Sequence, residues 1–203
     1  MTAATKGEQT RAQIIDQALR MAETVGLEGL TFGELAAALG TSKSGLFAHF
    51  ASKEDLQLEV IQALVDRFIS SIIHPAFTKA RGEPRLRALF ERYLPWVGNH
   101  ADGGRGCLLT QLQYEFQNKR GRVKDKLAAA ERSWFETLTK ACDIAIKEKH
   151  FKGTIDPEQF AYELLGIFTF YQHAARFFAD PRAEQRATAA FAALVERSRA
   201  SKS

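Results

Sequence analysis

The sequence has little of what marks membrane-spanning, secreted and disulfide-bonded proteins. No apolar run reaches the roughly 18 residues of a transmembrane helix, because charged residues interrupt every candidate. The N-terminal segment MTAATKGEQTR lacks the apolar centre of a secretory signal, so we expect a cytoplasmic protein without a membrane partner. The two cysteines, Cys107 and Cys142, lie far apart and outside any C-x-x-C pattern. We expect buried, reduced thiols, with a redox role as the alternative.

Motifs for catalysis and for metal binding are also missing. The five histidines form no H-x-x-x-H or E-x-x-H pair of the kind that holds a metal ion. The sequence contains no G-x-S-x-G, the turn that exposes a nucleophilic serine. The glycine-rich segment GGRG at 103–106 is too short for a phosphate-binding loop and lacks its lysine and preceding strand. We therefore predict no enzymatic activity, no metal and no cofactor.

Charge is unevenly distributed along the chain. The net charge of +4 would suit an acidic partner. Residues 1–60, however, carry five basic and eight acidic side chains, and the excess of base lies later. Its densest part is KRGRVKDK at 119–126. Net charge therefore does not indicate that the N-terminal part binds nucleic acid. Only the placement of single residues can indicate it.

Apolar residues spaced three and four apart predict helices along the whole chain, and no strand with clean alternation is present. Thr-x-x-Glu capping boxes open a first helix after Thr5 and a second after Thr31. Gly40 permits a tight turn after the second helix, because glycine adopts positive φ without steric cost. A third, short helix is expected over 42–49, and a long fourth helix over 52–74.

Prolines mark several of the later helix boundaries. Pro75 should end or disturb the fourth helix, and Pro95 should bend or end a helix over 85–97. Asp156-Pro157 and Asp180-Pro181 each place an N-cap acid before a first-turn proline, which predicts the starts of the last two helices. Further helices are expected over 107–116 and 122–150. The predicted fold class is all-α.

The second and third helices have the spacing of a helix-turn-helix. Ala36 and Gly40 lie four residues apart, which places small residues where the two helices cross. Leu46 would pack inward and fix the rotation of the third helix. The major groove of B-DNA admits one α-helix, and a recognition helix reads base edges from its N-terminal residues. In this sequence those residues are Ser42, Lys43, Ser44 and Gly45.

The run LTFGELAAALGTSKSGLFAHFASKEDL resembles the N-terminal DNA-binding domain of the TetR family of transcriptional regulators. The resemblance covers residues 14–58: a hydroxylic residue opens the second helix, a small-residue turn follows, and Ser-Lys-Glu opens the fourth. It implies a three-helix DNA-binding domain over 1–52 and a larger helical bundle for effector binding and dimerisation over 53–203. It also implies a homodimeric repressor that a small effector releases from a pseudo-palindromic operator in double-stranded DNA.

The family pattern assigns DNA contacts residue by residue. Thr31 and Lys53 become phosphate contacts at helix N-termini, and His49 lies near a backbone phosphate. Phe47 stands where the family commonly has tyrosine, so a hydroxyl contact to phosphate is missing. Taken singly, a hydroxyl here is a helix cap and a lysine a solvated charge; their joint spacing favours DNA binding. The remaining assigned positions are Thr41, Ser42, Lys43, Ser44 and Gly45.

Aromatic residues along the later helices either pack a core or line an effector pocket. For any single ring we favour the core. The resemblance implies a pocket in this part of the chain, and so many rings would suit a largely apolar effector. The candidate pocket residues are Phe68, Phe90, Tyr93, Trp96, Gln113, Tyr114, Trp134, Phe168, Tyr171 and His173.

The last two predicted helices suit a dimer interface. The helix that begins at Pro157 is apolar on more than one face, which requires burial on two sides. The alanine-rich final helix permits close approach of another helix, and a twofold axis would double the base contacts. The candidate interface residues are Phe160, Leu164, Phe168, Tyr171, Phe178, Ala190, Phe191 and Leu194. The alternative function is an all-helical ligand-binding protein or enzyme whose helix-turn-helix is structural or binds protein.

Overall fold

The computed structural model describes residues 5–98 and 107–200, and these residues form helices joined by turns, with no strand among them. The all-α prediction is confirmed. By packing, the chain divides into two compact units, Met1–Arg67 with Leu108–Ala128 and Phe68–Cys107 with Ala129–Ser203. The predicted functional boundary between residues 52 and 53 stays a prediction.

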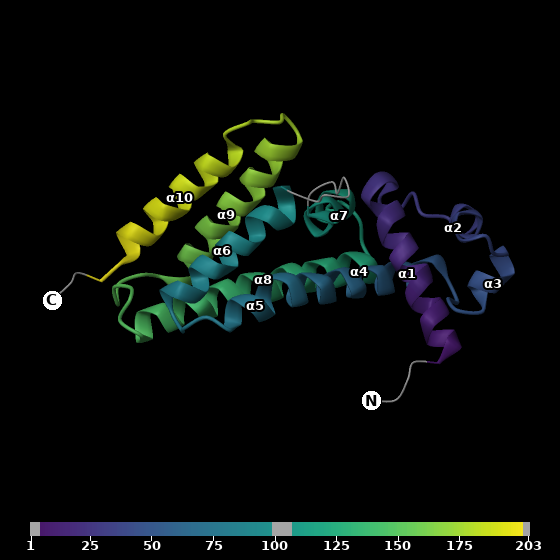
Figure 1. The fold of residues 1–203 in the computed structure, drawn as a ribbon, viewed down its shortest axis with the longest axis horizontal. Coiled ribbons are helices and arrows are strands. Elements are labelled where there is room, and N and C mark those ends of the chain that lie inside the picture. The colour runs from purple at the N-terminus through teal and green to yellow at the C-terminus, as the bar shows by residue number, and fades with distance from the viewer. Residues whose placement is uncertain (1–4, 99–106, 201–203) are drawn as a thin grey trace. The chain divides into compact units, whose positions relative to one another are not determined.

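The first unit contains the N-terminal helices together with a segment from the middle of the chain. In Figure 1, α2 and α3 lie beside α1. Its elements are α1 (Lys6–Val25), α2 (Phe32–Leu39), α3 (Lys43–Phe47), α4 (Lys53–Phe68) up to Arg67, α7 (Leu108–Phe116) and the start of α8 (Arg122–Lys147). Predicted caps open these helices: the Thr5 amide donates to Glu8 Oε2 at 2.7 Å, and the Asp55 amide donates to Ser52 Oγ at 3.0 Å.

A small apolar core holds the first unit together. Each such side chain, when fully removed from water, stabilises the fold by about 1.5–3 kcal/mol. The residues with 1% or less of their surface exposed include Leu27, Leu30, Leu35, Leu46, Phe50, Leu56, Val60 and Ile61. Because these residues come from α2, α3, α4 and the loops before α2 and α4, the core fixes the angle between α2 and α3.

The second unit is a bundle in which α9 (Pro157–Arg176) lies between α6 (Glu83–Gly98) and α10 (Ala183–Ser198) (Figure 1). The rest of α8, a π-helical segment over Ile69–Ile73 and the short α5 (His74–Phe77) complete it. Stacked rings run through its core: the Phe90 ring lies 4.1 Å from that of Phe191, and the Tyr93 ring lies 4.0 Å from that of Phe168.

Pro75 disturbs its helix, as the sequence predicts, whereas Pro95 does not end the helix that contains it. The predicted fourth helix is not continuous to residue 74, because α4 ends at Phe68 and a π-helical turn follows before Pro75 opens α5. A π-helical turn accommodates the missing amide donor of a following proline while the chain stays helical. Pro95 does not end α6, which continues to Gly98. Buried Leu94 and Val97 on either side hold that turn in place.

The starts of the last two helices show one prediction confirmed and one wrong. Asp156 caps α9, and its Oδ1 accepts the Glu158 amide at 2.9 Å. Asp180 does not cap α10, whose N-cap position is Arg182. The Asp180 carboxylate instead accepts the Arg182 amide at 2.9 Å, and this bond closes a turn just before α10 begins at Ala183. The predicted end of α8 at residue 150 also falls short, at Lys147.

Candidate DNA interface

The turn between α2 and α3 has the geometry that the glycine predicts. Gly40 has φ 62° and ψ 31°, in the left-handed region. The Gly40 amide donates to Ala37 O at 3.2 Å, and the Thr41 amide donates to Ala36 O at 3.0 Å. These two bonds satisfy the last carbonyls of α2 in the manner of a Schellman ending. The turn therefore sets the direction in which α3 leaves α2.

The N-terminal face of α3 is polar, exposed and densely packed. Ser42 is the N-cap, with its Oγ 3.1 Å from the Gly45 amide and 3.0 Å from Ser44 Oγ. A Cβ at Gly45 would lie 3.2 Å from Thr41 Oγ1 and 3.3 Å from Ser42 Oγ, so any side chain there would crowd these hydroxyls. Buried Leu46 anchors the opposite face. The structure thus brings the predicted groove-facing residues together at one helix end.

Phe47 and Thr31 each have a structural partner within the helix-turn-helix. The Phe47 ring is 47% exposed and lies 4.5 Å from the Phe32 ring at the start of α2. The Thr31 hydroxyl accepts the Glu34 amide at 3.2 Å and donates to the Glu34 carboxylate at 2.8 Å. Thr31 is therefore the cap of α2, at a helix N-terminus whose dipole favours an anion.

Two predicted phosphate contacts, Lys53 and His49, also bind other groups in the first unit. The Lys53 ammonium donates to the carbonyl of Glu28, a bond that uses one of its three N–H donors. The His49 carbonyl accepts from the Arg11 guanidinium, which also pairs with Glu59. The guanidinium carbon of Arg11 lies 4.5 Å from the centre of the Phe50 ring, a cation–π contact. Sequence reasoning missed Arg11, because its partners lie 38 or more residues away.

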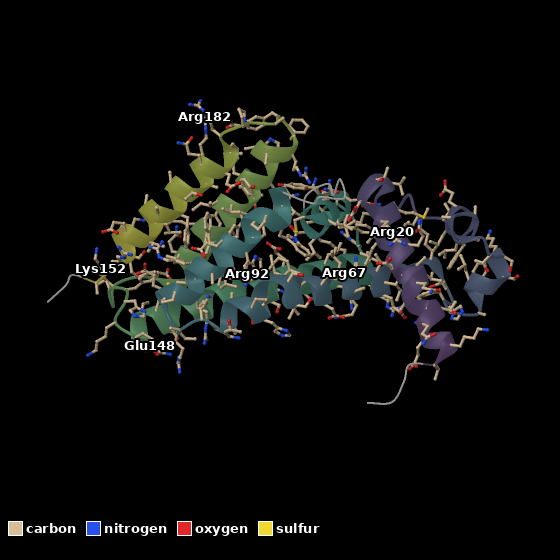
Figure 2. All side chains as sticks on the ribbon, viewed as in Figure 1. Arg20, Arg67, Arg92, Glu148, Lys152 and Arg182 are labelled. Atoms are coloured by element: carbon tan, nitrogen blue, oxygen red, sulfur yellow. The ribbon has the colours of Figure 1, made fainter. Side chains whose placement is uncertain are left out.

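An ion pair at Asp16 also joins α1 to α4. The Asp16 carboxylate accepts from Arg20, one turn on, and from Arg67, and Figure 2 labels both arginines. Burial raises the pKa of Asp16, but the bonds from Arg67 and Arg20 outweigh it and hold the pKa below its usual 3.8. Asp16 therefore stays ionised at neutral pH and links α1 and α4, the two helices that flank the helix-turn-helix.

The basic run at 119–126 belongs to the first unit, and the sequence analysis did not assign it there. Residues 1–67 carry six basic and nine acidic side chains, whereas 108–128 carry five and two, so the unit is neutral overall. The added charges meet acids directly: Arg122 lies 3.2 Å from Glu54, and Lys119 lies 3.1 Å from Glu28. The run itself was the only sequence signal for this association.

Six of the ten candidate pocket residues form one ring cluster in the second unit. The Phe68 ring lies 5.1 Å from Trp134 and 5.9 Å from Trp96, and the Phe168 ring lies 4.0 Å from Tyr93, 5.9 Å from Phe90 and 6.2 Å from Trp134. Five of these rings are buried and Trp96 is half-buried. They pack against one another as the rings of a core do.

The other four candidate pocket residues lie apart from this ring cluster or have a different role. Tyr171 donates its hydroxyl to Leu94 O at 3.3 Å, and it is buried. His173 is exposed and stacks on Phe177 at 4.9 Å, which corrects its assignment to a pocket among the rings. Gln113 and Tyr114 belong to the first unit, on α7, where Tyr114 is 60% exposed.

The predicted dimer residues need correction. Of the eight, only Phe178 and Ala190 are exposed. The other six have 4% or less of their surface exposed inside one chain, because they form the inward stripes of α9 and α10: Phe160, Leu164, Phe168, Tyr171, Phe191 and Leu194. The exposed stripe of α9 carries large apolar side chains instead, namely Tyr162 and Phe170, at 70% and 63% exposed, and its C-cap Phe177 is 81% exposed.

An open groove of about 530 Å³ runs between α9 and α10 in the second unit. Six small residues line it together with Ile167, Phe170, Tyr171 and Leu194, and its charged lining residues are Glu163, Arg186 and Arg197. Arg197 pairs with Glu163 across the groove, and Arg186 lies 3.2 Å from Asp180. The small residues are Gly166, Ala174, Ala183, Ala187, Ala190 and Ala193.

Both cysteines are buried, and neither forms a disulfide. Burial, with smaller contributions from Asp143 and Asp156, raises the pKa of Cys142 to about 12, so its thiol stays protonated. Within residues 5–98 and 107–200, no group of three or more histidine, cysteine, aspartate and glutamate side chains could hold a metal ion. None of the helices in that part of the chain combines the length and the apolar character needed to cross a membrane.

Two family models match the chain. Residues 82–191, more than half of the chain, match the model described as "Tetracyclin repressor-like, C-terminal domain". Residues 14–60, which include the helix-turn-helix, match the model described as "Bacterial regulatory proteins, tetR family". The chain belongs to the TetR family. The resemblance on which the sequence analysis relied is therefore confirmed, and this TetR-family chain carries both of the family's domains.

Curated relatives align with part of this TetR-family chain. The HTH-type transcriptional activator FasR of Mycolicibacterium smegmatis is 30% identical over 98 residues, which are 48% of this chain and 45% of FasR. The HTH-type transcriptional regulator TcmR of Streptomyces glaucescens is 32% identical over 99 residues, 48% of this chain and 42% of TcmR. The chain thus spans about half the length of the curated relatives it matches.

Solved structures share the whole fold. SCO4454, a TetR-family transcriptional regulator from Streptomyces coelicolor, superposes with a TM-score of 0.81 at 15% identity, over 94% of this chain and 96% of that one. AibR, solved with isovaleryl coenzyme A and operator DNA, superposes with a TM-score of 0.68 at 21% identity, over 88% and 96%. At such identities the likeness establishes the fold.

Proposed function

We propose that this TetR-family protein is a DNA-binding transcriptional regulator, a repressor that a small molecule releases from its operator. One observation carries the proposal: the polar N-terminus of α3 is exposed while Leu46 fixes its opposite face. Helices of this kind enter the major groove and read base edges from their first residues. DNA binding places the protein in the cytoplasm, and it acts by binding rather than by catalysis.

The roles of single residues follow from their positions. Ser42, Lys43 and Ser44 face the groove, where hydroxyls and one long cation donate to base edges. Thr31 and Lys53 contact phosphates from the starts of α2 and α4. Because the first unit is neutral overall, its non-specific affinity for DNA is low, and binding depends on these placed groups.

The protein acts as a homodimer through the exposed faces of α9 and α10. Six glycine and alanine residues are among those that line the groove between these helices, and they allow helices of a second copy to approach closely. The exposed Phe170 and Tyr162 on the same face supply apolar area that water would otherwise cover. A twofold axis here makes a four-helix interface and gives two copies of α3, which suit a pseudo-palindromic operator.

The effector is a small, largely apolar molecule held by the helical body. The number of aromatic rings in this body supports an apolar effector, although the rings around Phe168 pack against one another as a core. An effector changes DNA binding only if it binds the DNA-free conformation more tightly than the DNA-bound one. AibR, whose structure holds both isovaleryl coenzyme A and operator DNA, supports ligand control in a protein of this fold.

A gel mobility-shift experiment tests the function. The full-length protein is mixed with a duplex spanning the DNA upstream of its own coding sequence, in excess non-specific competitor. We expect a discrete complex at about 10 nM protein or below and nuclease protection of two half-sites about 10 base pairs, or a multiple of that, apart. A protein that binds this duplex no better than competitor DNA contradicts the proposal and favours the structural or protein-binding role for the helix-turn-helix.

In-vitro transcription from the same upstream DNA determines the direction of control. We expect less transcript when the protein is added, because a dimer on the operator blocks polymerase. FasR is named an activator. An increase in transcript would therefore show activation in this chain too, and would overturn the repressor assignment while leaving DNA binding intact.

A further inference from the structure

The loop that joins α1 to α2 is fastened by a carboxylate from α7. Glu115 Oε1 accepts the Glu28 amide at 2.7 Å, and Oε2 accepts the Leu27 amide at 3.2 Å. All three residues belong to the first unit. A carboxylate that accepts two backbone amides makes stronger hydrogen bonds than a neutral group would. Glu115 therefore binds the loop at two adjacent peptide groups, although 87 residues separate it from Glu28.

Gly26 leaves the space that the Glu115 carboxylate occupies. Gly26, the residue before the two bonded amides, has φ 70°, which side chains rarely adopt. A Cβ at Gly26 would lie 2.5 Å from Glu115 Oε2, and 2.8 Å from its carboxyl carbon. Glycine thus serves two purposes here, because it ends α1 and leaves the space that Glu115 fills.

Other side chains also bind Leu27 and Glu28. The Gln57 amide, itself buried, donates to Leu27 O at 2.8 Å. The Lys53 ammonium donates to Glu28 O, and the Lys119 ammonium lies 3.1 Å from the Glu28 carboxylate. The backbone amides and carbonyls of both residues are therefore all bound by side chains. Leu30, fully buried, and the α2 cap Thr31 follow directly along the chain.

We propose that Glu115 is a positioning residue for DNA binding, which acts from α7 by fixing the α1–α2 loop of the same unit. The inference rests on the proposed function. Glu115 touches no DNA; it sets the loop that places Thr31 and, through α2 and the Gly40 turn, α3. A displacement of α7 withdraws the carboxylate from the Leu27 and Glu28 amides and frees the start of α2.

The test compares Glu115→Gln and Glu115→Ala with Glu136→Gln and Glu136→Ala. Glu136 is an exposed α8 residue that pairs with Lys140 at 3.6 Å, so the control removes the same charge from another helix. Operator affinity is measured at a temperature where circular dichroism shows every variant folded. Hydrogen exchange of a peptide covering 26–31 is measured in parallel. A purely structural role would alter the melting temperature without altering these two readouts.

We expect Glu115→Ala to bind the operator about tenfold more weakly and to exchange the 26–31 amides faster, because both charged hydrogen bonds are lost. Glu115→Gln, which keeps one acceptor oxygen, should fall between Ala and the parent. Both Glu136 variants should stay within twofold of the parent. Parent-like affinity or unchanged exchange in folded Glu115→Ala overturns the inference alone. A parent that binds no specific DNA removes the proposed function together with this inference.

Discussion

At the scale of single residues, the sequence predicts what depends on near neighbours. Gly40, Ser42 and Leu46 have their predicted conformation, cap and burial, because each depends on contacts within a few positions. Arg11 and Glu115 could not be predicted, because their partners lie 48 and 87 residues away and both are ordinary charged residues on helices. Long-range polar contacts follow from the tertiary fold, which single-residue patterns do not contain.

Two glycine-to-alanine substitutions in the helix-turn-helix should act in opposite directions. Gly40→Ala should lower the free energy of unfolding by about 1 kcal/mol, because alanine is strained at φ 62° although no atom lies within 4 Å of the new Cβ. Gly33→Ala, within α2, should raise it by about 0.5–1 kcal/mol, since its Cβ meets only Thr31 Oγ1, at 3.9 Å. Urea unfolding measures both, and a stabilised Gly40→Ala would contradict the account of the turn.

At the scale of elements, the helices were predicted well and their outward faces were not. Apolar spacing locates α9 and α10, but it does not tell which of two apolar stripes packs within the chain. The prediction therefore took Phe160 and Leu164 for interface residues, although both are buried by their own protomer. The same ambiguity applied to Asp180, whose carboxylate serves a turn before α10 instead of its N-cap. Both outcomes depend on packing partners rather than on local pattern.

An ion-pair cluster joins the start of α6 to the end of α10 and predicts a pH dependence. Glu83 Oε1 lies 2.7 Å from Arg199 and 2.7 Å from Arg87. The hydrogen bond from Arg199, aided by Arg87 and opposed by burial, holds the pKa of Glu83 below its usual 4.5. A carboxyl whose pKa is depressed on folding stabilises the fold above about pH 4.5 and loses that contribution as the pH falls through the folded value.

Glu83→Gln should therefore be less stable than the parent at pH 7, by about 1 kcal/mol since the arginines are partly exposed. The difference should shrink as the pH is lowered from 4.5 towards 3, because the parent's carboxyl then becomes protonated. Thermal melts of both proteins across this range measure the difference directly. A gap between the two that stays constant from pH 7 to pH 3 would rule out the ionised carboxylate as its cause.

At the scale of the whole molecule, dimerisation should depend on one face of α10. Ala190→Glu places a charge in the lining of the groove between α9 and α10 and should leave a monomer of about 22.6 kDa. Ala189→Glu is the matched control, because Ala189 is exposed on the same helix and does not line the groove. Light scattering after gel filtration separates the two outcomes, and a dimeric Ala190→Glu would place the interface elsewhere.

The proposed function depends on whether α3 reads the DNA sequence. Fluorescence anisotropy with the upstream duplex should give a dissociation constant for Lys43→Ala at least about fivefold above that of the parent, the loss expected for a base-contacting cation. Lys140→Ala, which removes the same charge from an exposed position on α8, should bind within twofold of the parent. Equal affinity of Lys43→Ala and the parent for that duplex would contradict the assignment of α3 as the recognition helix.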